Sequence, residues 1–490
     1  MSLPQLVRAA IMVAAICTGV APSPRAEGEN LRGEAKSLRA KYARDIEQLA
    51  AWCEKEGLAP EAKQTRAIPA QDDPCKLYLP VLPREVGPLK LAEDSPAALV
   101  QWNTRLTKLR EEDAAALYDL ARRAIRQHQP SLAYEVLLTV IGENPDHEGA
   151  RRVFGYQKFH DQWRTAYEAR KLRSGMVWHE KFGWLSKANL QRYLDGQRPA
   201  GSRWISAQED ARLHRDIRSG WEVESEHYQI RTNRSIEAAV ALGQKLETLC
   251  RLWQQIFIRF HASEAYIDGL LNGRAQTVRG DAPRYNVVYF RDHDDYTRSL
   301  RSRVPNLGIS LGIYMPQDRT AYFFAGDEDA GRVLNHEATH QLFQQTRHAP
   351  LDVGRNANFW VIEGIAMFME TLHQEHGYYV LGGLDDVRML AARQHLIDGD
   401  FFVPLAQLTA YGTERLQSDP KVSSLYSQMA AMTNFLVFYD GGRYRDALVA
   451  YLTAVYSNRA TLKTLAELTG AGYAELDRQY QEFMKAGGPQ

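Results

Sequence analysis

The segment N-H-E-A-T-H-Q at residues 335–341 constrains the fold of this 490-residue chain more than any other feature. His336, Glu337 and His340 form the motif H-E-x-x-H, and on an α-helix two residues four apart lie on one face. Both imidazoles can then bind one zinc ion at about 2.0–2.1 Å. Glu337 lies beside the first ligand and is free to take a proton from a water activated by the metal. The motif therefore predicts a buried helix that lines a one-ion zinc site.

A catalytic zinc ion usually takes three protein ligands and leaves the fourth position to water. No further histidine follows His340 with the spacing that metzincins require. Residues 359–370 (F-W-V-I-E-G-I-A-M-F-M-E) instead predict a second apolar helix with Glu363 near its start, and a turn at residues 356–358 can reverse the chain before it. The helix pair would aim Glu363 at the ion, and Glu370 is the alternative third ligand.

The motif H-E-x-x-H followed by W-x-x-E-G-x-A resembles the gluzincins of the peptidase MA superfamily, in particular exported bacterial proteins with both motifs. The resemblance covers about residues 220–485, but the sequence matches the family motifs closely only over residues 336–340 and 360–370. It implies one zinc ion held by His336, His340 and Glu363, with Glu337 as the general base.

The resemblance also implies a thermolysin-like fold: a small mixed sheet, the HExxH helix, the Glu helix and a helical C-terminal half. The strand at the edge of the sheet would be Thr320 to Ala325, where an extended peptide can pair. Thermolysin has an acidic residue four positions after the ligand Glu, whereas this chain has Met367. Glu370, seven positions after Glu363, either orients one of the imidazoles or is a surface carboxylate.

Gluzincins also use a donor to the oxyanion from the helices after the ligand Glu, and the segment S-S-L-Y-S-Q-M resembles such a helix. Its Tyr426 is the candidate donor, with a core tyrosine as the alternative interpretation. His373 and His376 follow the Glu helix, and we interpret them as surface residues near its C-terminal end rather than ligands.

The first residues predict an export signal. Residues 9–21 form an apolar run too short to span a bilayer comfortably, and prolines and small residues follow it up to residue 26. The protein is therefore expected to be exported, to the periplasm or outside the cell, and to have no stable membrane insertion after signal removal.

The rest of the chain falls into three parts, which predict an α+β protein. Residues 27–175 are expected to be all helical, with a tetratricopeptide-like hairpin broken at Gln129–Pro130 but no second copy at a 34-residue period. This region is interpreted as support for the following domain, or as a docking module for a protein partner. Residues 176–219 predict a small connecting element, and residues 220–490 the metallopeptidase domain.

Within residues 220–490, alternating strand and helix patterns lead to the zinc motif. The expected elements are a strand at 221–232, a helix capped by Ser235, a strand at 285–290, a helix starting at Asp292, and a hairpin at 308–314 and 320–325.

Charge and cysteine content narrow the function further. Lys and Arg total 60 and so do Asp and Glu, so no long-range field attracts nucleic acid. Cys53 and Cys75 either close one loop or are free thiols.

We expect a zinc metallopeptidase that acts on peptides or proteins. It is expected to be an endopeptidase rather than an aminopeptidase, because no G-x-M-E-N motif precedes His336. The alternative is an exported binding or scaffold protein with an idle zinc site.

Overall fold

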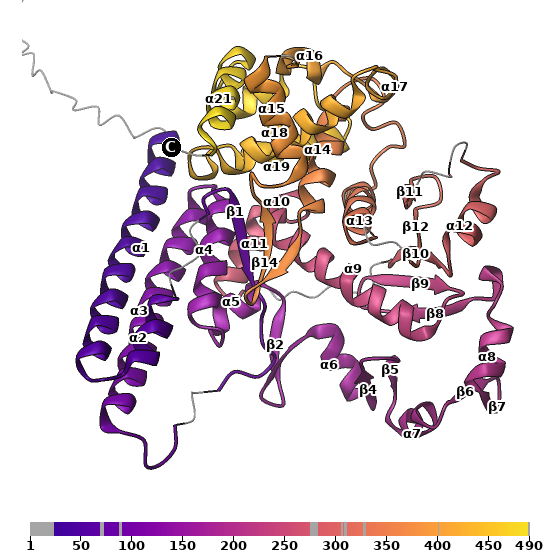
Figure 1. Cartoon of the computed structure of the whole chain (residues 1–490), viewed down its shortest axis with the longest axis horizontal. Helices are drawn as coiled ribbons and strands as arrows, with labels where there is room; N and C mark the ends of the chain where they lie inside the picture. Colours follow the sequence, from indigo (N-terminus) through magenta and orange to yellow (C-terminus); the bar gives the residue numbers. More distant parts are fainter. Residues whose placement is uncertain are drawn as a thin grey trace, which may run out of the picture.

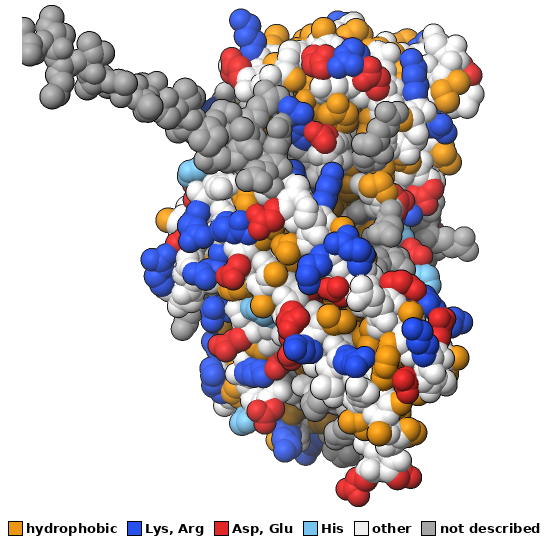
Figure 2. Space-filling view, turned by 90° about the vertical axis from the view of Figure 1, so that its left-hand side faces the viewer, with side chains coloured by type: hydrophobic (Ala, Val, Ile, Leu, Met, Phe, Trp, Pro, Cys, Tyr) orange, Lys and Arg blue, Asp and Glu red, His pale blue; other side chains and the backbone are white. Residues whose placement is uncertain are grey.

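The computed structural model describes residues 24–68, 73–87, 91–274, 283–304, 307, 311–326, 330–399 and 401–488. The protein is α+β, with more helix than strand (Figure 1). Most of the predicted export signal, residues 1–23, lies outside the described residues. Within the described ranges, no helix has the length and apolar character needed to cross a membrane. Charges of both signs alternate over the face of the N-terminal helices, in keeping with the balanced composition (Figure 2).

The N-terminal helices stand together on one side of the molecule (Figure 1). They are α1 (Pro24–Lys55), α2 (Ala59–Arg66), α3 (Ala97–Arg126), α4 (Pro130–Glu143) and α5 (Glu148–Val153). The predicted break at Gln129–Pro130 is confirmed, since α4 begins at Pro130 and packs on α3. Cys53 and Cys75 are free thiols, and each is buried in a different core cluster.

The prediction that residues 27–175 are all helical is wrong at three strands. One of them, β1 (Lys76–Pro80), pairs with β14 (Tyr378–Gly382) in a three-stranded sheet completed by β13 (His373–Glu375). A lone strand has unpaired backbone groups, so β1 forms only because β14 supplies its hydrogen bonds. The other two strands belong to a repeat.

Three hairpin-and-helix units of about 20 residues form an arm along the bottom of Figure 1. The first unit lies in the region predicted to be helical, and the other two lie where the sequence predicted a small connecting element. We call residues 156–213 the repeat arm. Its elements are β2 (Tyr156–Phe159), β3 (Gln162–Thr165), α6 (Ala166–Arg173), β4 (Met176–His179), β5 (Gly183–Ser186), η1 (Lys187–Asn189), α7 (Leu190–Leu194), β6 (Gln197–Ala200), β7 (Arg203–Ser206) and α8 (Ala207–Leu213). Aromatic rings join successive units, with centroid distances of 6.3 Å for Tyr167–Trp184 and 6.1 Å for Tyr193–Trp204. Thr165 and Ser206 cap the helices that follow them.

The arm leads, through the short helix η2 (Ile217–Ser219), into a five-stranded mixed sheet of order β11-β12-β10-β9-β8. Its strands are β8 (Trp221–Glu224), β9 (Tyr228–Thr232), β10 (Tyr285–Phe290), β11 (Ile313–Met315) and β12 (Thr320–Phe324). β10 is parallel to both β9 and β12, and the single strand predicted at residues 221–232 is a hairpin of two. The prediction that Thr320–Ala325 is the edge strand is wrong, because β12 pairs with β10 on one side and with β11 on the other.

Helices surround this sheet and form the C-terminal half. They are α9 (Ile236–Ile256), α10 (Ile258–His261), α11 (Glu264–Leu271), α12 (His293–Leu300), α13 (Ala330–Thr346), α14 (Phe359–Glu370), α15 (Val387–Asp398), α16 (Leu405–Thr409), α17 (Thr413–Gln417), α18 (Val422–Gly442), α19 (Arg445–Tyr456), α20 (Thr464–Thr469) and α21 (Tyr473–Ala486). The predicted cap Ser235 is confirmed, and Asp292, where a helix was predicted to begin, is the N-cap of α12. α14 packs between α13 and α18, and all twelve of its residues are buried. This packing buries two carboxylates, Glu363 and Glu370.

Candidate metal centre

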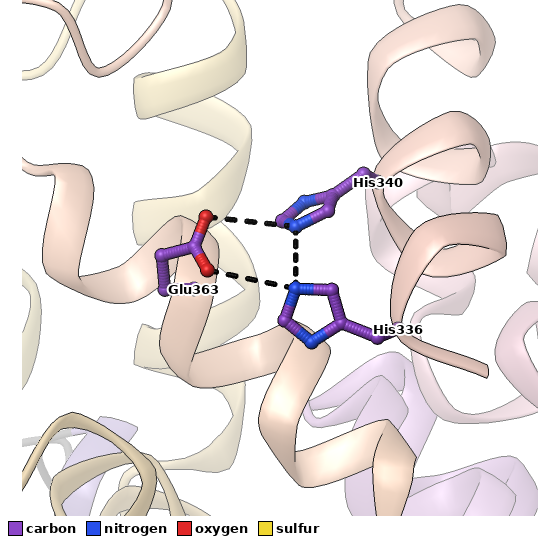
Figure 3. A group of neighbouring side chains, drawn as sticks. All are labelled: His336, His340 and Glu363. Atoms are coloured by element: carbon purple, nitrogen blue, oxygen red, sulfur yellow. Dashed lines mark hydrogen bonds and ion pairs between the residues drawn. The ribbon is translucent and has the colours of Figure 1, made fainter. Parts of the chain in front are cut away.

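Three side chains from two packed helices point at one another (Figure 3). His336 and His340 lie one turn apart on α13, and their Nε2 atoms are 3.0 Å apart. The Glu363 carboxylate on α14 lies 3.5 Å from the first Nε2 atom and 3.6 Å from the second. Ligands at 2.0–2.1 Å around a tetrahedral ion are about 3.3–3.4 Å from one another. Both the donor types and their spacing therefore fit a zinc ion.

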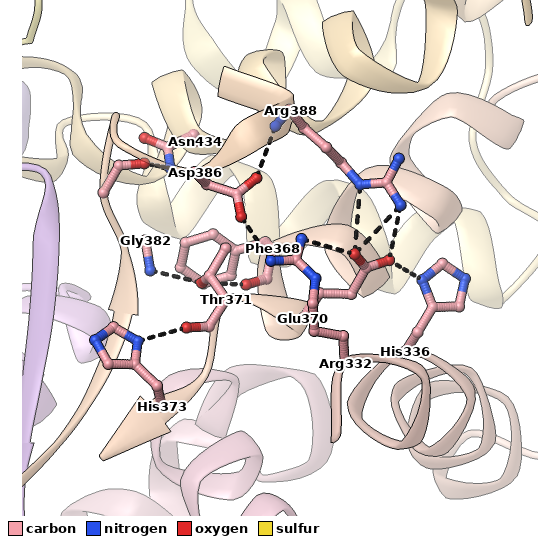
Figure 4. Close-up of polar contacts among 11 residues, drawn as sticks. Arg332, His336, Phe368, Glu370, Thr371, His373, Gly382, Asp386, Arg388 and Asn434 are labelled. Carbon is pink, nitrogen blue, oxygen red and sulfur yellow. Dashed lines mark hydrogen bonds and ion pairs between the residues drawn. The ribbon is translucent and has the colours of Figure 1, made fainter. Parts of the chain in front are cut away.

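The far side of the His336 ring is held by Glu370 (Figure 4). The distance from Nδ1 to the carboxylate is 2.7 Å, and Arg332 and Arg388 approach the same carboxylate to 3.2 and 3.3 Å. Burial alone would raise the pKa of Glu370, but the bond to His336 and the two guanidinium groups lower it. Glu370 thus meets the nitrogen opposite to the one that faces Glu363, which suits an orienting residue and not a third ligand.

The two imidazoles differ in their electrostatics. Burial opposes the charged form of His336, but its contacts with the Glu363 and Glu370 carboxylates outweigh this effect and raise its pKa to about 10. Burial dominates at His340 and lowers its pKa to about 4, which favours the neutral ring with a lone pair for a metal. The carboxylates of this cluster give it the negative charge that a divalent cation would balance.

Glu337 is fixed from the neighbouring sheet. The backbone N–H of Tyr314, on the edge strand β11, donates to Oε2 of Glu337 at 2.7 Å. Burial raises the pKa of Glu337 to about 7, and the charges of Glu363 and Glu370 act in the same direction. A carboxylate with a pKa near neutrality can accept a proton and give it back.

The structure also brings Tyr426 to this cluster. Its side chain, on α18, lies near Glu363, and burial together with the Glu363 charge raises the pKa of its hydroxyl above the ordinary value. His373 and His376 lie on β13 and in the turn after it, are largely exposed, and stay outside the group of ligand atoms. Sequence reasoning missed the contacts of Tyr314, Arg332 and Arg388, which no local pattern signals.

A second His/Glu group in the described part of the chain is formed by Glu226, His227 and Glu247. Nδ1 of His227 lies 2.7 Å from Oε2 of Glu247, and the other oxygen of Glu247 accepts from Ser225 Oγ and the His227 N–H. The positive charge of Arg251 acts on the same group. Both oxygens of the Glu247 carboxylate therefore already accept hydrogen bonds. The group of His336, His340 and Glu363 is for this reason the better metal centre.

Neither the protein-family models nor the curated proteins contain a match to this chain.

Proposed function

We propose that this chain is a zinc metallopeptidase of the gluzincin type, with a thermolysin-like catalytic domain in residues 220–490, and that it is exported. The observation that carries the proposal is the convergence of His336, His340 and Glu363 at separations of 3.0–3.6 Å, with Glu337 beside them. This donor set, with one coordination position left over, is that of catalytic rather than structural zinc sites.

Each side chain has a role in the proposed reaction. When bound, a zinc ion supplies Lewis acidity, which polarises the scissile carbonyl and makes water acidic. Oε2 of Glu337 is held by the Tyr314 N–H, and its Oε1 is left to take a proton from water and to pass it to the leaving amine. Tyr426 donates to the developing oxyanion. Glu370 keeps the His336 ring in place.

An extended peptide is the substrate that the surrounding backbone favours. β11 is a sheet edge, and its residue Tyr314 touches Glu337, so a peptide added along β11 would bring its main chain to the general base. An endopeptidase is preferred because this mode of binding needs no free terminus.

The N-terminal helices support the catalytic domain in this account. α4 contacts α9, α10 and α19, and Arg445 at the start of α19 forms an ion pair with Glu135 on α4. A module that served only to dock a partner would not need this attachment.

Metal-dependent cleavage tests the proposal. The purified full chain should bind one zinc ion and cut casein, should lose cleavage after dialysis against dipicolinate, and should regain it when zinc is restored. A chain that binds zinc but cleaves nothing in casein or a broad peptide library would instead favour a binding or scaffold protein with an idle metal site.

A further inference from the structure

A cavity of about 130 Å³ lies where the first unit of the repeat arm meets α4, α9 and α11. Its volume is close to the roughly 150 Å³ of an apolar cavity that holds benzene. Its lining includes the apolar side chains of Phe154, Ile258 and Leu270 together with polar and charged groups. None of the proposed zinc-site residues lines it, so the question of what it binds is separate from catalysis.

Two buried hydroxyls of this cavity have no partner. The side chains of Tyr134 and Tyr167 line the cavity and belong to residues that are 4% and 7% exposed. Among the described residues, neither phenol oxygen has a hydrogen-bond partner. Leaving a buried hydroxyl unpaired is unfavourable, so a small rotation of either ring toward an occupant that accepts hydrogen bonds would be favoured.

Two opposite charges also line the cavity without meeting. Arg251 makes one long hydrogen bond, to Thr248 Oγ1 at 3.4 Å, and forms no ion pair within 4.0 Å with any described residue. Glu226 accepts at Oε2 from Thr165 Oγ1 at 2.9 Å, and its Oε1 has no partner in the described part of the chain. Both residues line the same cavity without forming an ion pair, and each charge shifts the pKa of the other group.

An occupant that bridges these two charges must carry both signs on a small frame. We propose that the cavity binds a small apolar α-amino acid as a zwitterion, with its carboxylate on Arg251, its ammonium group on Glu226 and its side chain against Phe154 and Ile258. The hydroxyls of Tyr134 and Tyr167 donate to the carboxylate. Charge-assisted hydrogen bonds of this kind are the strong ones in proteins.

Calorimetric titration of the zinc-loaded full chain with L-leucine, leucine amide and N-acetyl-leucine tests the proposal. L-leucine should bind at one site, and the two blocked compounds, which lack the carboxylate or the ammonium charge, should bind at least about tenfold more weakly. The variant Glu226→Gln should weaken L-leucine binding by at least about tenfold. Glu222→Gln, a matched change at an exposed position of β8 outside the cavity, should bind like the wild type.

Tyr167→Phe guards against a folding defect, because it removes only a hydroxyl without a partner. This variant should melt at or above the wild-type temperature and still bind L-leucine more weakly. No binding of L-leucine at millimolar concentration would mean that the cavity holds water only and would overturn the proposal. Equal binding of the blocked compounds, or wild-type binding by a folded Glu226→Gln variant, would overturn it as well.

Discussion

Nδ1 of His336 lies 2.7 Å from Oε1 of Glu370, so the ring of a candidate zinc ligand is fixed from the side opposite to Glu363. A neutral imidazole whose Nδ1–H donates to a carboxylate presents its Nε2 lone pair to a metal. Glu370 itself is buried and is held by Arg332 and Arg388. The affinity of the metal centre should therefore depend on a residue that does not bind the metal.

Replacement of that residue gives the first prediction. Glu370→Gln should weaken zinc binding by about 10–100-fold, as the loss of a carboxylate behind a ligating histidine typically does. Competition with a chromophoric chelator measures the affinity. Glu375→Gln, at an exposed position of β13, is the matched control and should bind zinc like the wild type. If a folded Glu370→Gln variant binds zinc with unchanged affinity, Glu370 does not orient the His336 ring.

The ligand set gives the second prediction. His336→Ala, His340→Ala and Glu363→Ala should each reduce the metal content well below one zinc ion per chain, because two protein ligands hold zinc much more weakly than three. His376→Ala, at an exposed histidine after β13, should keep its zinc. Elemental analysis after gel filtration measures the content. Full zinc retention by the Glu363 variant would point to a different third ligand.

The motif helix and the Glu helix could be predicted from sequence because both are local patterns. The spacing of His336 and His340 fixes their shared face, and the apolar run around Glu363 fixes a buried helix. The role of Glu370 could not be decided in this way. Its contact with His336 depends on how α13 and α14 pack, which the sequence of either helix leaves open.

Strand order was the weaker part of the prediction. β12 was correctly expected as a strand, but its place inside the sheet depends on pairing with β10, some thirty residues earlier along the chain. β1 depends on a partner about 300 residues away, so its own sequence carries little signal. The repeat arm is hard to predict because its units are short and share little beyond a Gly before the first strand, a Trp in the second strand (Trp163, Trp184 and Trp204) and a following Thr or Ser.

The proposed oxyanion donor gives the third prediction. Tyr426→Phe removes one hydroxyl beside Glu363 and should lower kcat by about 10²–10³-fold, with little change in KM, because the hydroxyl acts on charge that develops in the transition state. Zinc content should stay at one ion per chain. Steady-state cleavage of a fluorogenic peptide separates the two constants. If the Tyr426→Phe variant has the kcat of the wild type, Tyr426 has no role in catalysis and serves only as a core residue.

The N-terminal helices give a prediction on pH. Asp113 on α3 lies 2.6 Å from Arg39 on α1, yet burial raises the pKa of Asp113 to about 6, with Glu143 adding to the shift. A raised carboxyl pKa stabilises the folded state below pH 3.8, and this stability is lost as the pH rises through 6. The shift corresponds to roughly 3 kcal/mol.

Asp113→Asn cannot ionise and should not lose this stability. Its melting temperature should therefore rise relative to that of the wild type between pH 4 and pH 7 (about the range of the shift). Thermal unfolding of both proteins across this range measures the difference. A constant difference would show that ionisation of Asp113 does not oppose folding.

The most direct test of the proposed function is casein cleavage by Glu337→Gln and wild-type protein at equal zinc content. Glu337 accepts a hydrogen bond from Tyr314 on the edge strand β11. Because Glu337 is not one of the three candidate ligands, its amide variant should keep one zinc ion per chain. We predict that zinc-loaded wild type cleaves casein and that the zinc-loaded variant does not. Cleavage by the variant at the wild-type rate, or no cleavage by zinc-loaded wild type, would contradict it.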